Sequence, residues 1–358
     1  MNILFLPTNI ASVPSITATA LNKLEGINAR NIIEKNHKYQ TTNKTTVVLA
    51  QRYYNRFHPL KWLNSRWEYG KELKKWIEWA DVLHYVCGPA FSNGVDLKWA
   101  TAKNKTIIIE WVGSDIRDPE ILFKINPYYS KVFNNGYEYK KLEETNNKKE
   151  VQKMFAKAKA IVNISPEISL FLDKRLFPEY NILYQRLNLK NFLPQYPSIN
   201  NLKPLIIHSP SAKNAKGTNL IMPIIEELKK EFNFEFVLLH NMRREKVLEI
   251  MHNADIFLDQ IICGGYGMAT TEAMAFGKPV MCYIMPELFD AGLPKEFPVV
   301  NTNPDNLKEQ LIKLITSPQL RHDIGKQSRL YAEKYFDAST IALQLVEIYK
   351  EALEKRGN

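Results

Sequence analysis

The sequence predicts an α/β protein built from two doubly wound parallel sheets in tandem. Short apolar runs alternate with segments whose apolar residues recur at helical spacing, and this alternation occurs in both halves of the chain. Most of the apolar runs are continuous, which is typical of strands that are covered on both faces. A chain of 358 residues is also long enough for about two domains.

The elements follow in order along the chain, and the second half shows them most clearly. Strands are predicted at 2–7, 81–88, 106–112 and 159–165 in the first half, and at 203–210, 234–240, 255–260, 278–284 and 297–301 in the second. Helices are predicted at 16–26, 218–232, 243–254, 268–276, 304–318 and 319–335.

The domain boundaries follow from a stretch without periodicity. Residues 189–204 carry three prolines and three asparagines, a composition that favours a hinge. We therefore expect one domain at 1–195, a second at 200–335, and a C-terminal helix at 336–358 that can pack back on the first domain.

Composition and charge narrow the class of partner. The chain is 45% hydrophobic with a formal charge of +10, so it favours anionic partners such as nucleic acid, an acidic membrane or a phosphorylated small molecule. No recognisable nucleic-acid-binding motif accompanies the charge, so we expect no nucleic acid. The first ten residues fit a buried strand better than a signal peptide, and no apolar run approaches the roughly 18 residues that span a bilayer. Three cysteines in apolar surroundings favour reduced thiols in a cytoplasmic protein.

A glycine-rich segment is the most informative feature. Residues 263–282, CGGYGMATTEAMAFGKPVMC, follow a predicted strand and lead into a helix. Ligands of doubly wound folds bind outside the carboxyl ends of the strands, and a helix N-terminus offers free N–H groups to anions. Gly264, Gly265 and Gly267 would let the backbone approach a diphosphate or sugar hydroxyls without Cβ clashes. A tight turn without a ligand remains the alternative.

Two stretches in the second half resemble a known family. The run EAMAFGKPV, from Glu272 to Val280, and the stretch HSPSAKNAKGTNLI at 208–221 resemble the retaining nucleotide-sugar glycosyltransferases of family 4, also called glycosyl transferases group 1. The resemblance is strong over the second half and loose over the first. It implies the GT-B fold, in which two Rossmann-like domains face a cleft, the first for the acceptor and the second for the donor.

The same resemblance implies an activity. The enzyme would move a sugar from a nucleotide-diphosphate sugar to a glycan or lipid-linked acceptor, with retention of configuration, in building a cell-surface polysaccharide or glycolipid. It would work in the cytoplasm, with possible peripheral contact at the inner face of the membrane. Such transfer uses the departing phosphate oxygen to accept the acceptor proton, so a separate general base is not required.

Donor-site residues carry over from the matching positions. Lys216, before the first helix of the second domain, would place charge at the departing phosphate, and Glu272 would hold the ribose diol. The remaining candidates for donor binding are Lys213, Gly217, Gly264, Gly265, Tyr266, Gly267, Met268, Asp259 and His208. We expect no metal and no cofactor, because the sequence has no Asp-x-Asp triplet and no spacing of His, Cys and Glu suited to a metal.

The sequence departs from the family at one carboxylate. Relatives carry a glutamate eight residues before the position of Glu272, and here that position is Gly264. Backbone N–H groups of Gly265 to Gly267 can replace it, or Asp259 can supply the carboxylate, although Asp259 can equally cap the turn. The missing glutamate keeps a second hypothesis open, a catalytically silent nucleotide-sugar-binding or scaffold protein of the GT-B fold. An epimerase or inverting transferase of the same fold is a third.

Acceptor candidates lie in the first half. The stretch WVGSDIRD at 111–118 follows a predicted strand, so Asp115 can bind an acceptor hydroxyl and Arg117 an anionic acceptor or the donor phosphates. A helix cap with a surface arginine is the alternative. Asn9 and Ser12, after the first strand, are further acceptor candidates. His84 lies inside a predicted strand, where a histidine is more often part of the core than of a functional site.

The aromatic and basic segment at 52–79 has two interpretations. It contains four tryptophans and three tyrosines on a net basic stretch. It can form a packed helix with Trp62, Trp76 and Trp79 in the core and its lysines in solvent. It can also lie on an anionic membrane, or stack on sugars of the acceptor.

Overall fold

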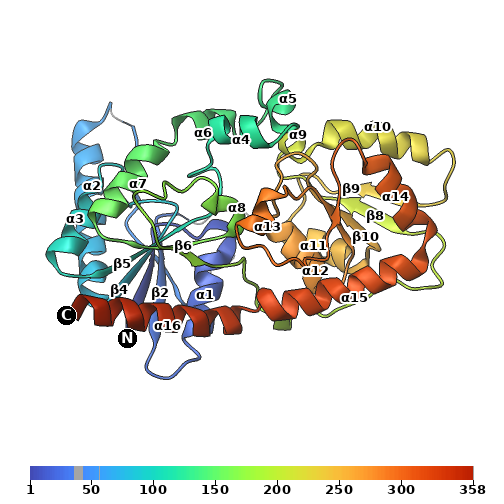
Figure 1. The fold of residues 1–358 in the computed structure, drawn as a ribbon. Coiled ribbons are helices and arrows are strands. Elements are labelled where there is room, and N and C mark those ends of the chain that lie inside the picture. The colour runs from blue at the N-terminus through green and yellow to red at the C-terminus, as the bar shows by residue number, and fades with distance from the viewer. Residues whose placement is uncertain (36–42, 56, 358) are drawn as a thin grey trace. The chain divides into compact units, whose positions relative to one another are not determined.

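The strands form two parallel sheets in the computed structural model, which describes residues 1–35, 43–55 and 57–357. The chain divides into two units, one from 1–117, 146–186 and the residues from 338 onward, the other from 118–145 and 187–337 (Figure 1). Residues 118–145, which the sequence placed with the first half, thus group with the second unit by their contacts.

The first unit is built on a seven-stranded sheet. Its strands are β1 (Asn2–Leu6), β2 (Asn28–Ile33), β3 (Thr46–Val48), β4 (Val82–Val86), β5 (Thr106–Trp111), β6 (Ile161–Ile164) and β7 (Asn181–Ile182). The order β3-β2-β1-β4-β5-β6-β7 reverses direction between β1 and β4. Strands β2, β3 and β7 had not been predicted, because β2 mixes polar and apolar residues and the other two span only two or three residues.

The second unit is built on a five-stranded sheet. It contains β8 (Leu205–His208), β9 (Glu235–Leu238), β10 (Ile256–Leu258), β11 (Val280–Cys282) and β12 (Val300–Asn301) in the order β12-β11-β10-β8-β9. The order reverses between β8 and β10, whose pairing is parallel from Ile256 and Ile206 to Leu258 and His208. Two doubly wound parallel sheets confirm the predicted fold class.

Helices cover the strands of each unit. The first unit contains α1 (Val13–Leu21), α2 (Pro59–Trp79), α3 (Val95–Ala102), α7 (Lys148–Lys157), α8 (Pro166–Ser169) and α16 (Ala338–Gly357). The second contains α4 (Pro119–Ile125), α5 (Tyr129–Phe133), α6 (Lys140–Thr145), α9 (Lys213–Lys216), α10 (Thr218–Leu228), α11 (Arg244–Asn253), α12 (Met268–Ala275), α13 (Glu287–Asp290), α14 (Leu307–Thr316) and α15 (Pro318–Tyr335).

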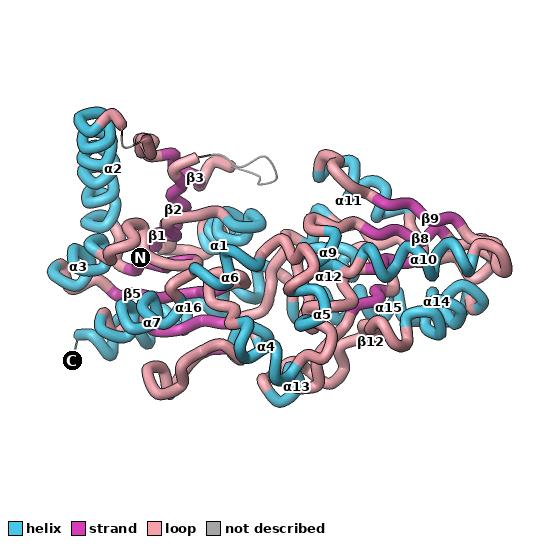
Figure 2. Tube along the Cα trace, turned by 90° about the horizontal axis from the view of Figure 1, so that it is seen from above, coloured by secondary structure: helices cyan, strands magenta, loops and turns pink. Residues whose placement is uncertain are grey.

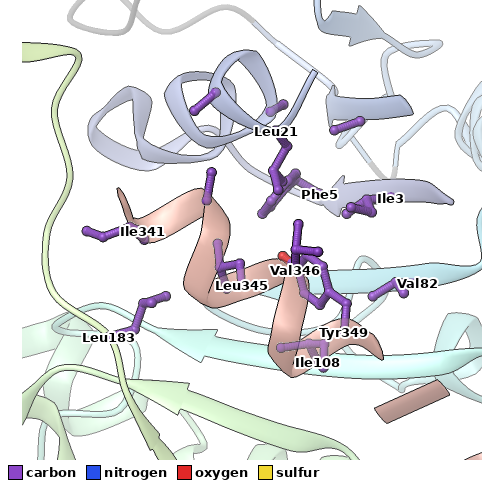
Figure 3. Packing of buried hydrophobic residues seen from close by; sticks show 14 of the residues in the cluster. Ile3, Phe5, Leu21, Val82, Ile108, Leu183, Ile341, Leu345, Val346 and Tyr349 are labelled. Carbon is purple, nitrogen blue, oxygen red and sulfur yellow. The ribbon is translucent and has the colours of Figure 1, made fainter. Parts of the chain in front are cut away.

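Helix α16 completes the core of the first unit. Leu345 and Tyr349 are fully buried and point toward residues of α1, β1, β4 and β5 (Figure 3). The Tyr349 hydroxyl lies 2.6 Å from Nδ1 of His84, which is fully buried as the sequence suggested for a core histidine. Burial lowers the pKa of His84. Helix α16 is therefore a structural part of the unit that contains β1.

The segment 118–145 is held to the second unit by polar contacts. Asn126 is 1% exposed and donates from Nδ2 to the carbonyl of Ile262 at 2.8 Å. The Tyr128 hydroxyl donates to Asp305 Oδ2 at 2.6 Å. These contacts reach across more than a hundred residues, so no local pattern in the sequence indicated them.

Helix α2 does not bury its tryptophans as predicted. Its buried residues are Tyr69, Gly70, Leu73 and Ile77, whereas Trp62, Trp76 and Trp79 are partly exposed. The prediction of three core tryptophans is wrong because the smaller side chains face the sheet and the indoles lie at the border of the contact. Arg56, which belongs to the predicted basic stretch, lies outside the described residues.

Candidate functional site

An ion pair lies where the order of the second sheet reverses. The loop after β8 leads through α9 to Lys216, and the loop after β10 begins with Asp259. The Lys216 ammonium and Asp259 Oδ1 are 2.6 Å apart, and the two side chains are 17% and 1% exposed. This is the place where open α/β sheets bind ligands. The sequence had named both residues as donor-site candidates without predicting that they pair.

Asp259 is also held from a third element. Its Oδ2 accepts a hydrogen bond of 2.6 Å from Thr270 Oγ1 in the first turn of α12. Burial disfavours the charge of Lys216, but the attraction of Asp259 outweighs burial, so the pKa of Lys216 is raised. Lys216 therefore carries its charge at neutral pH, in a fixed position beside the start of α12.

Gly217 allows the chain to turn from α9 into α10. Its φ is +80°, and a Cβ at this position would lie 2.5 Å from Ile261 Cγ1. A residue with a side chain would be both strained and crowded here, so glycine is required after Lys216. Lys213, the first residue of α9, is partly exposed three residues away from Lys216.

His208 holds the sheet together instead of facing a ligand. It is fully buried; Nδ1 lies 2.8 Å from the Leu258 carbonyl and Nε2 lies 2.8 Å from Thr218 Oγ1. Burial lowers its pKa to about 4. Because a neutral imidazole has one donor and one acceptor, both ring nitrogens are used within the fold. The structure does not support the predicted donor contact of His208.

Gly264 occupies a position that admits no side chain. Its φ is +80°, and a Cβ there would lie 2.3 Å from Met285 Cγ and 3.1 Å from Asn126 Nδ2. The Gly264 carbonyl accepts from the Met285 N–H at 2.9 Å, which fixes the turn. A glutamate therefore cannot replace Gly264 in this backbone conformation, and the carboxylate that relatives carry is excluded by the local packing.

The next residues of the loop differ in their surroundings. The Gly265 carbonyl accepts from Gln260 Nε2 and from Cys282 Sγ, so its oxygen points into the protein. Tyr266 is 7% exposed and packs against Phe297 and Phe336, with ring centroids 4.9 and 5.9 Å away. This packing places Tyr266 in the core, which does not support the predicted donor contact.

Gly267 and Met268 lie at the start of α12. A Cβ at Gly267 would meet no atom within 4 Å, so the backbone is open to approach from that side. Gly267 is the residue before the first turn, and no side chain within the described part of the protein caps this N-terminus. The N–H groups that begin α12, from Met268 on, are thus available at a point next to Asp259 and Lys216.

Glu272 is paired with an arginine that the sequence analysis did not name. Arg244, at the start of α11, donates from Nη2 to Glu272 Oε1, and the two side chains are 32% and 10% exposed. Burial raises the pKa of Glu272, and Arg244 opposes that rise. Two consecutive arginines after a predicted strand, Arg243 and Arg244, were the signal that could have indicated a cation near the ligand.

Lys278 lies at the other end of α12. It is 1% exposed and donates to the Gln195 carbonyl, so it anchors the connecting segment at 189–204. Burial lowers its pKa to about 8, with Asp255 acting in the opposite direction. Lys278 thus has a structural contact.

In the first unit, Asp115 follows β5. Its carboxylate accepts from the Gly113 N–H at 2.6 Å and, more weakly, from Val112 at 3.3 Å. Burial raises the pKa of Asp115 to about 6, against these backbone hydrogen bonds. A carboxyl group that titrates near neutral pH at the carboxyl end of a strand has the properties of a functional group.

The other acceptor candidates are engaged within the first unit. Arg117 Nη2 donates to Glu167 Oε1 at 2.8 Å. Asn9 is 1% exposed, and its Oδ1 accepts from the Ser15 N–H at 3.0 Å at the start of α1. Ser12 is 4% exposed in the same turn. Contact of Asn9 and Ser12 with an acceptor is not supported, because the turn buries them.

Three cavities are lined by residues of the first unit, not by Lys216 or Glu272. Their volumes are about 660, 740 and 640 Å³, and each includes residues of α2 or of the segment before it. Within the described ranges, no group of three or more His, Cys, Asp and Glu side chains is placed to hold a metal ion. In the same ranges, no helix has the length and apolar character needed to cross a bilayer.

Comparison with known proteins gives a family match within the second unit. Residues 224–331, from α10 to α15, match the family model described as glycosyl transferases group 1. Residues 224–331 are thus similar to the group 1 glycosyltransferases, and similar solved structures show that the chain has the GT-B fold. The match includes the stretch from Glu272 to Val280, whose family resemblance is thereby confirmed, whereas the stretch at 208–221 lies outside the matched residues. No curated protein is a significant sequence match to the chain.

Solved structures similar to this GT-B chain extend over nearly its whole length. Sucrose-phosphate synthase from Thermosynechococcus elongatus is 16% identical with a TM-score of 0.67, and the match covers 99% of each chain. HepE from Anabaena in complex with UDP-glucose is 13% identical with a TM-score of 0.60 over 98% of this chain and 100% of that one. WaaG, a glycosyltransferase involved in lipopolysaccharide biosynthesis, is 13% identical with a TM-score of 0.57 over 98% and 99%.

Proposed function

We propose that this glycosyltransferase moves a sugar from a nucleotide-diphosphate sugar to a glycan or lipid-linked acceptor, with retention of configuration, in cell-surface polysaccharide or glycolipid synthesis. The observation that carries the proposal is the Lys216 ammonium, held by buried Asp259 at the reversal point of the second sheet. The UDP-glucose complex of HepE and the role of WaaG in lipopolysaccharide biosynthesis support the donor class and the setting.

The chemistry assigns a separate task to each group. As the sugar–phosphate bond breaks, negative charge develops on the departing diphosphate. Lys216 and the first N–H groups of α12 stabilise that charge, because they are fixed before the reaction begins. Asp259 positions Lys216 and does not contact the substrate. The departing phosphate oxygen accepts the proton of the acceptor hydroxyl, which attacks from the same face.

Glu272 holds the ribose in this proposal. Its pairing with Arg244 orients the carboxylate, and an ionised carboxylate has several lone pairs for the two ribose hydroxyls. Gly265, Gly267 and Met268 bring the backbone to the diphosphate or sugar, and Lys213 adds a second cation. Gly264 contributes the shape of the turn. The sugar hydroxyls that relatives hold with a glutamate are bound here by backbone N–H groups.

The acceptor is assigned to the first unit. Asp115 accepts a hydrogen bond from the acceptor hydroxyl, and Arg117 lies two residues further along the same loop. The reaction takes place without a metal ion, in the cytoplasm and at the inner face of the membrane. Lys216 and the start of α12 supply the positive charge that a metal would otherwise supply.

The test is a direct assay of transfer. Purified protein is incubated with UDP-, GDP- and ADP-sugars and a lipid-extract acceptor pool, with and without a chelator, and the product anomer is read by NMR. An α-linked product from an α-linked donor, at the same rate with chelator present, supports the proposal. A β-linked product refutes retention, and loss of activity with chelator refutes metal independence.

The packing at Gly264 favours a second candidate, a nucleotide-sugar-binding protein without transferase activity. The carboxylate missing there cannot be restored by a simple substitution, since Met285 occupies the space. The two candidates differ in one experiment. UDP-glucose should raise the melting temperature of either protein. Only an active transferase should also release UDP when an acceptor is present.

A further inference from the structure

Helix α2 has an exposed apolar face. Leu60, Leu63 and Trp67 are 79%, 55% and 65% exposed, and spacings of three and four residues put them on one side of the helix. A groove of about 640 Å³ runs between this helix and α3, which lies beside it (Figure 2). Apart from lysines, the groove is lined mainly by aromatic and aliphatic groups: Trp62, Leu63, Trp67, Phe91, Val95 and Trp99.

A second cavity, with a larger share of polar lining than the groove, adjoins it. It has a volume of about 660 Å³ and is lined by Arg52, Arg66, Ser92 and Asn146, together with Tyr54 and residues at the start of α7. Apart from Arg66, which lies within α2, most of its residues follow β3 and β4 or come from the first turns of α7, so this side of the cavity lies at the carboxyl end of the parallel sheet. Arg66 lines both the cavity and the groove.

The charge of these two spaces is unbalanced. Within the described part of the chain, Arg66, Lys71, Lys74 and Lys75 have no ion-pair partner. The acidic residues that line the same spaces are already neutralised: Glu150 pairs with Lys153 at 2.8 Å and Glu78 with Lys103 at 3.1 Å. Arg52 is likewise paired, with Glu34 at 2.6 Å. The uncompensated cations therefore favour an anionic ligand.

Arg66 is the residue at which the two spaces meet. Its guanidinium lies over the Trp62 ring, 4.5 Å from the centroid. Its Nε is buried and has no hydrogen-bond partner among the described residues. A buried donor without an acceptor is costly and uncommon, and a guanidinium binds phosphate oxygens with two parallel hydrogen bonds. By contrast, Nε of Arg52 donates to Glu34 at 3.0 Å.

We propose that the first unit binds an amphiphilic phosphate, with its head group at Arg66 in the second cavity and its hydrocarbon chain in the groove between α2 and α3. The ligand is a phosphorylated lipid that binds as a single molecule, as distinct from a membrane surface. Arg66 binds the phosphate oxygens, and Lys71 and Lys74 flank the chain where it leaves the groove. The assignment rests on the proposed function to the extent that this lipid is the acceptor, which would then be lipid-linked.

The experiment uses decyl phosphate below its critical micelle concentration, titrated into the full chain with binding followed by calorimetry. Decyl maltoside serves as the neutral probe of equal chain length, and inorganic phosphate as the head group alone. The variants are Arg66→Gln, Arg66→Lys and Trp67→Ala. Arg175→Gln is the control, because Arg175 is a surface arginine of the same unit with a 90% exposed side chain.

We expect decyl phosphate to bind at least tenfold more tightly than either decyl maltoside or inorganic phosphate. Arg66→Gln should remove the preference for decyl phosphate over decyl maltoside, and Arg66→Lys should retain part of it. Trp67→Ala should weaken both decyl compounds about equally, while Arg175→Gln changes nothing. Melting temperatures within about 2 °C of the wild type would show that the variants remain folded.

Two results would overturn the proposal. One is equal binding of the charged and neutral decyl compounds by the wild-type chain. The other is binding only to vesicles that contain anionic lipid, unaffected by Arg66→Gln, which would make α2 a membrane-docking helix instead. Binding of UDP, GDP and ADP is measured on the same samples, since it concerns the second unit. If the wild-type chain bound decyl phosphate but none of UDP, GDP and ADP, the proposed transferase would be rejected and the lipid site would be kept.

Discussion

At the scale of single residues, the pairing of Lys216 with Asp259 ties activity to stability. Removing one partner of a buried pair leaves the other charge uncompensated. We expect Lys216→Met to lower kcat by about 10²–10³-fold and to lower the free energy of unfolding by about 2–3 kcal/mol. The double variant Lys216→Met/Asp259→Asn should recover most of the stability and none of the turnover. Kinetics and urea unfolding on both variants check this, and recovery of turnover in the double variant would contradict the role of Lys216.

The raised pKa of Asp115 predicts that activity depends on pH. Its folded-state pKa of about 6 lies above the ordinary value of 3.8, so the carboxyl group is protonated below pH 6 and ionised above it. If the ionised form accepts the acceptor hydroxyl, kcat/KM should fall as the pH is lowered through about 6. The Asp115→Asn variant should be slower at pH 8 and show no such fall. A wild-type profile that stays flat from pH 8 to pH 5 would contradict this assignment.

The same raised pKa has a consequence for stability. Because the folded protein binds the Asp115 proton more tightly than the unfolded chain does, burial of the ionised carboxylate costs stability above pH 6. That cost diminishes as the pH falls from 6 toward 3.8. Asp115→Asn should therefore be more stable relative to the wild type at pH 7 than at pH 4, and unfolding at both values gives the comparison.

At the scale of elements, Arg244 and Glu272 connect the start of α11 to the middle of α12. We expect Glu272→Gln to weaken UDP binding about tenfold, because a neutral amide is a poorer partner for a ribose diol and for Arg244. Arg244→Gln should weaken UDP binding less, because it removes only the orientation of the carboxylate. Calorimetric titration with UDP measures both. If the variants altered only the acceptor KM, the ribose assignment would be wrong.

Sequence patterns predicted elements whose signal is local. The strands around β8, β10 and β11 are continuous apolar runs, and the glycine-rich segment was expected after the strand at 255–260, where the structure has the loop that follows β10. The patterns could not show that both ring nitrogens of His208 lie within hydrogen-bond distance of Leu258 and Thr218, or that Arg244 donates a hydrogen bond to Glu272. Those contacts join residues of separate elements, and only the folded chain brings them together.

At the scale of the whole molecule, the two units each have their own core, so we expect two unfolding transitions. Leu345 is fully buried in the first unit and Ile221 in the second. Leu345→Ala should lower only one transition and Ile221→Ala only the other, each by about 2–5 kcal/mol. Differential scanning calorimetry with and without UDP identifies them, since UDP should raise the transition that Ile221→Ala lowers. A single transition shifted equally by both variants would show that the units unfold as one.

The division of the chain also sets the order in which the units can be completed during synthesis. All residues of the second unit have been synthesised once residue 337 has left the ribosome. Nearly two hundred residues are added between the synthesis of its segment 118–145 and that point. The first unit, begun by β1, still lacks α16 at that moment, and its core faces water where Leu345 and Tyr349 will lie. The unit that contains β1 is therefore completed after the second unit, and a stop codon between the second unit and α16 would leave the core around β1 without its cover.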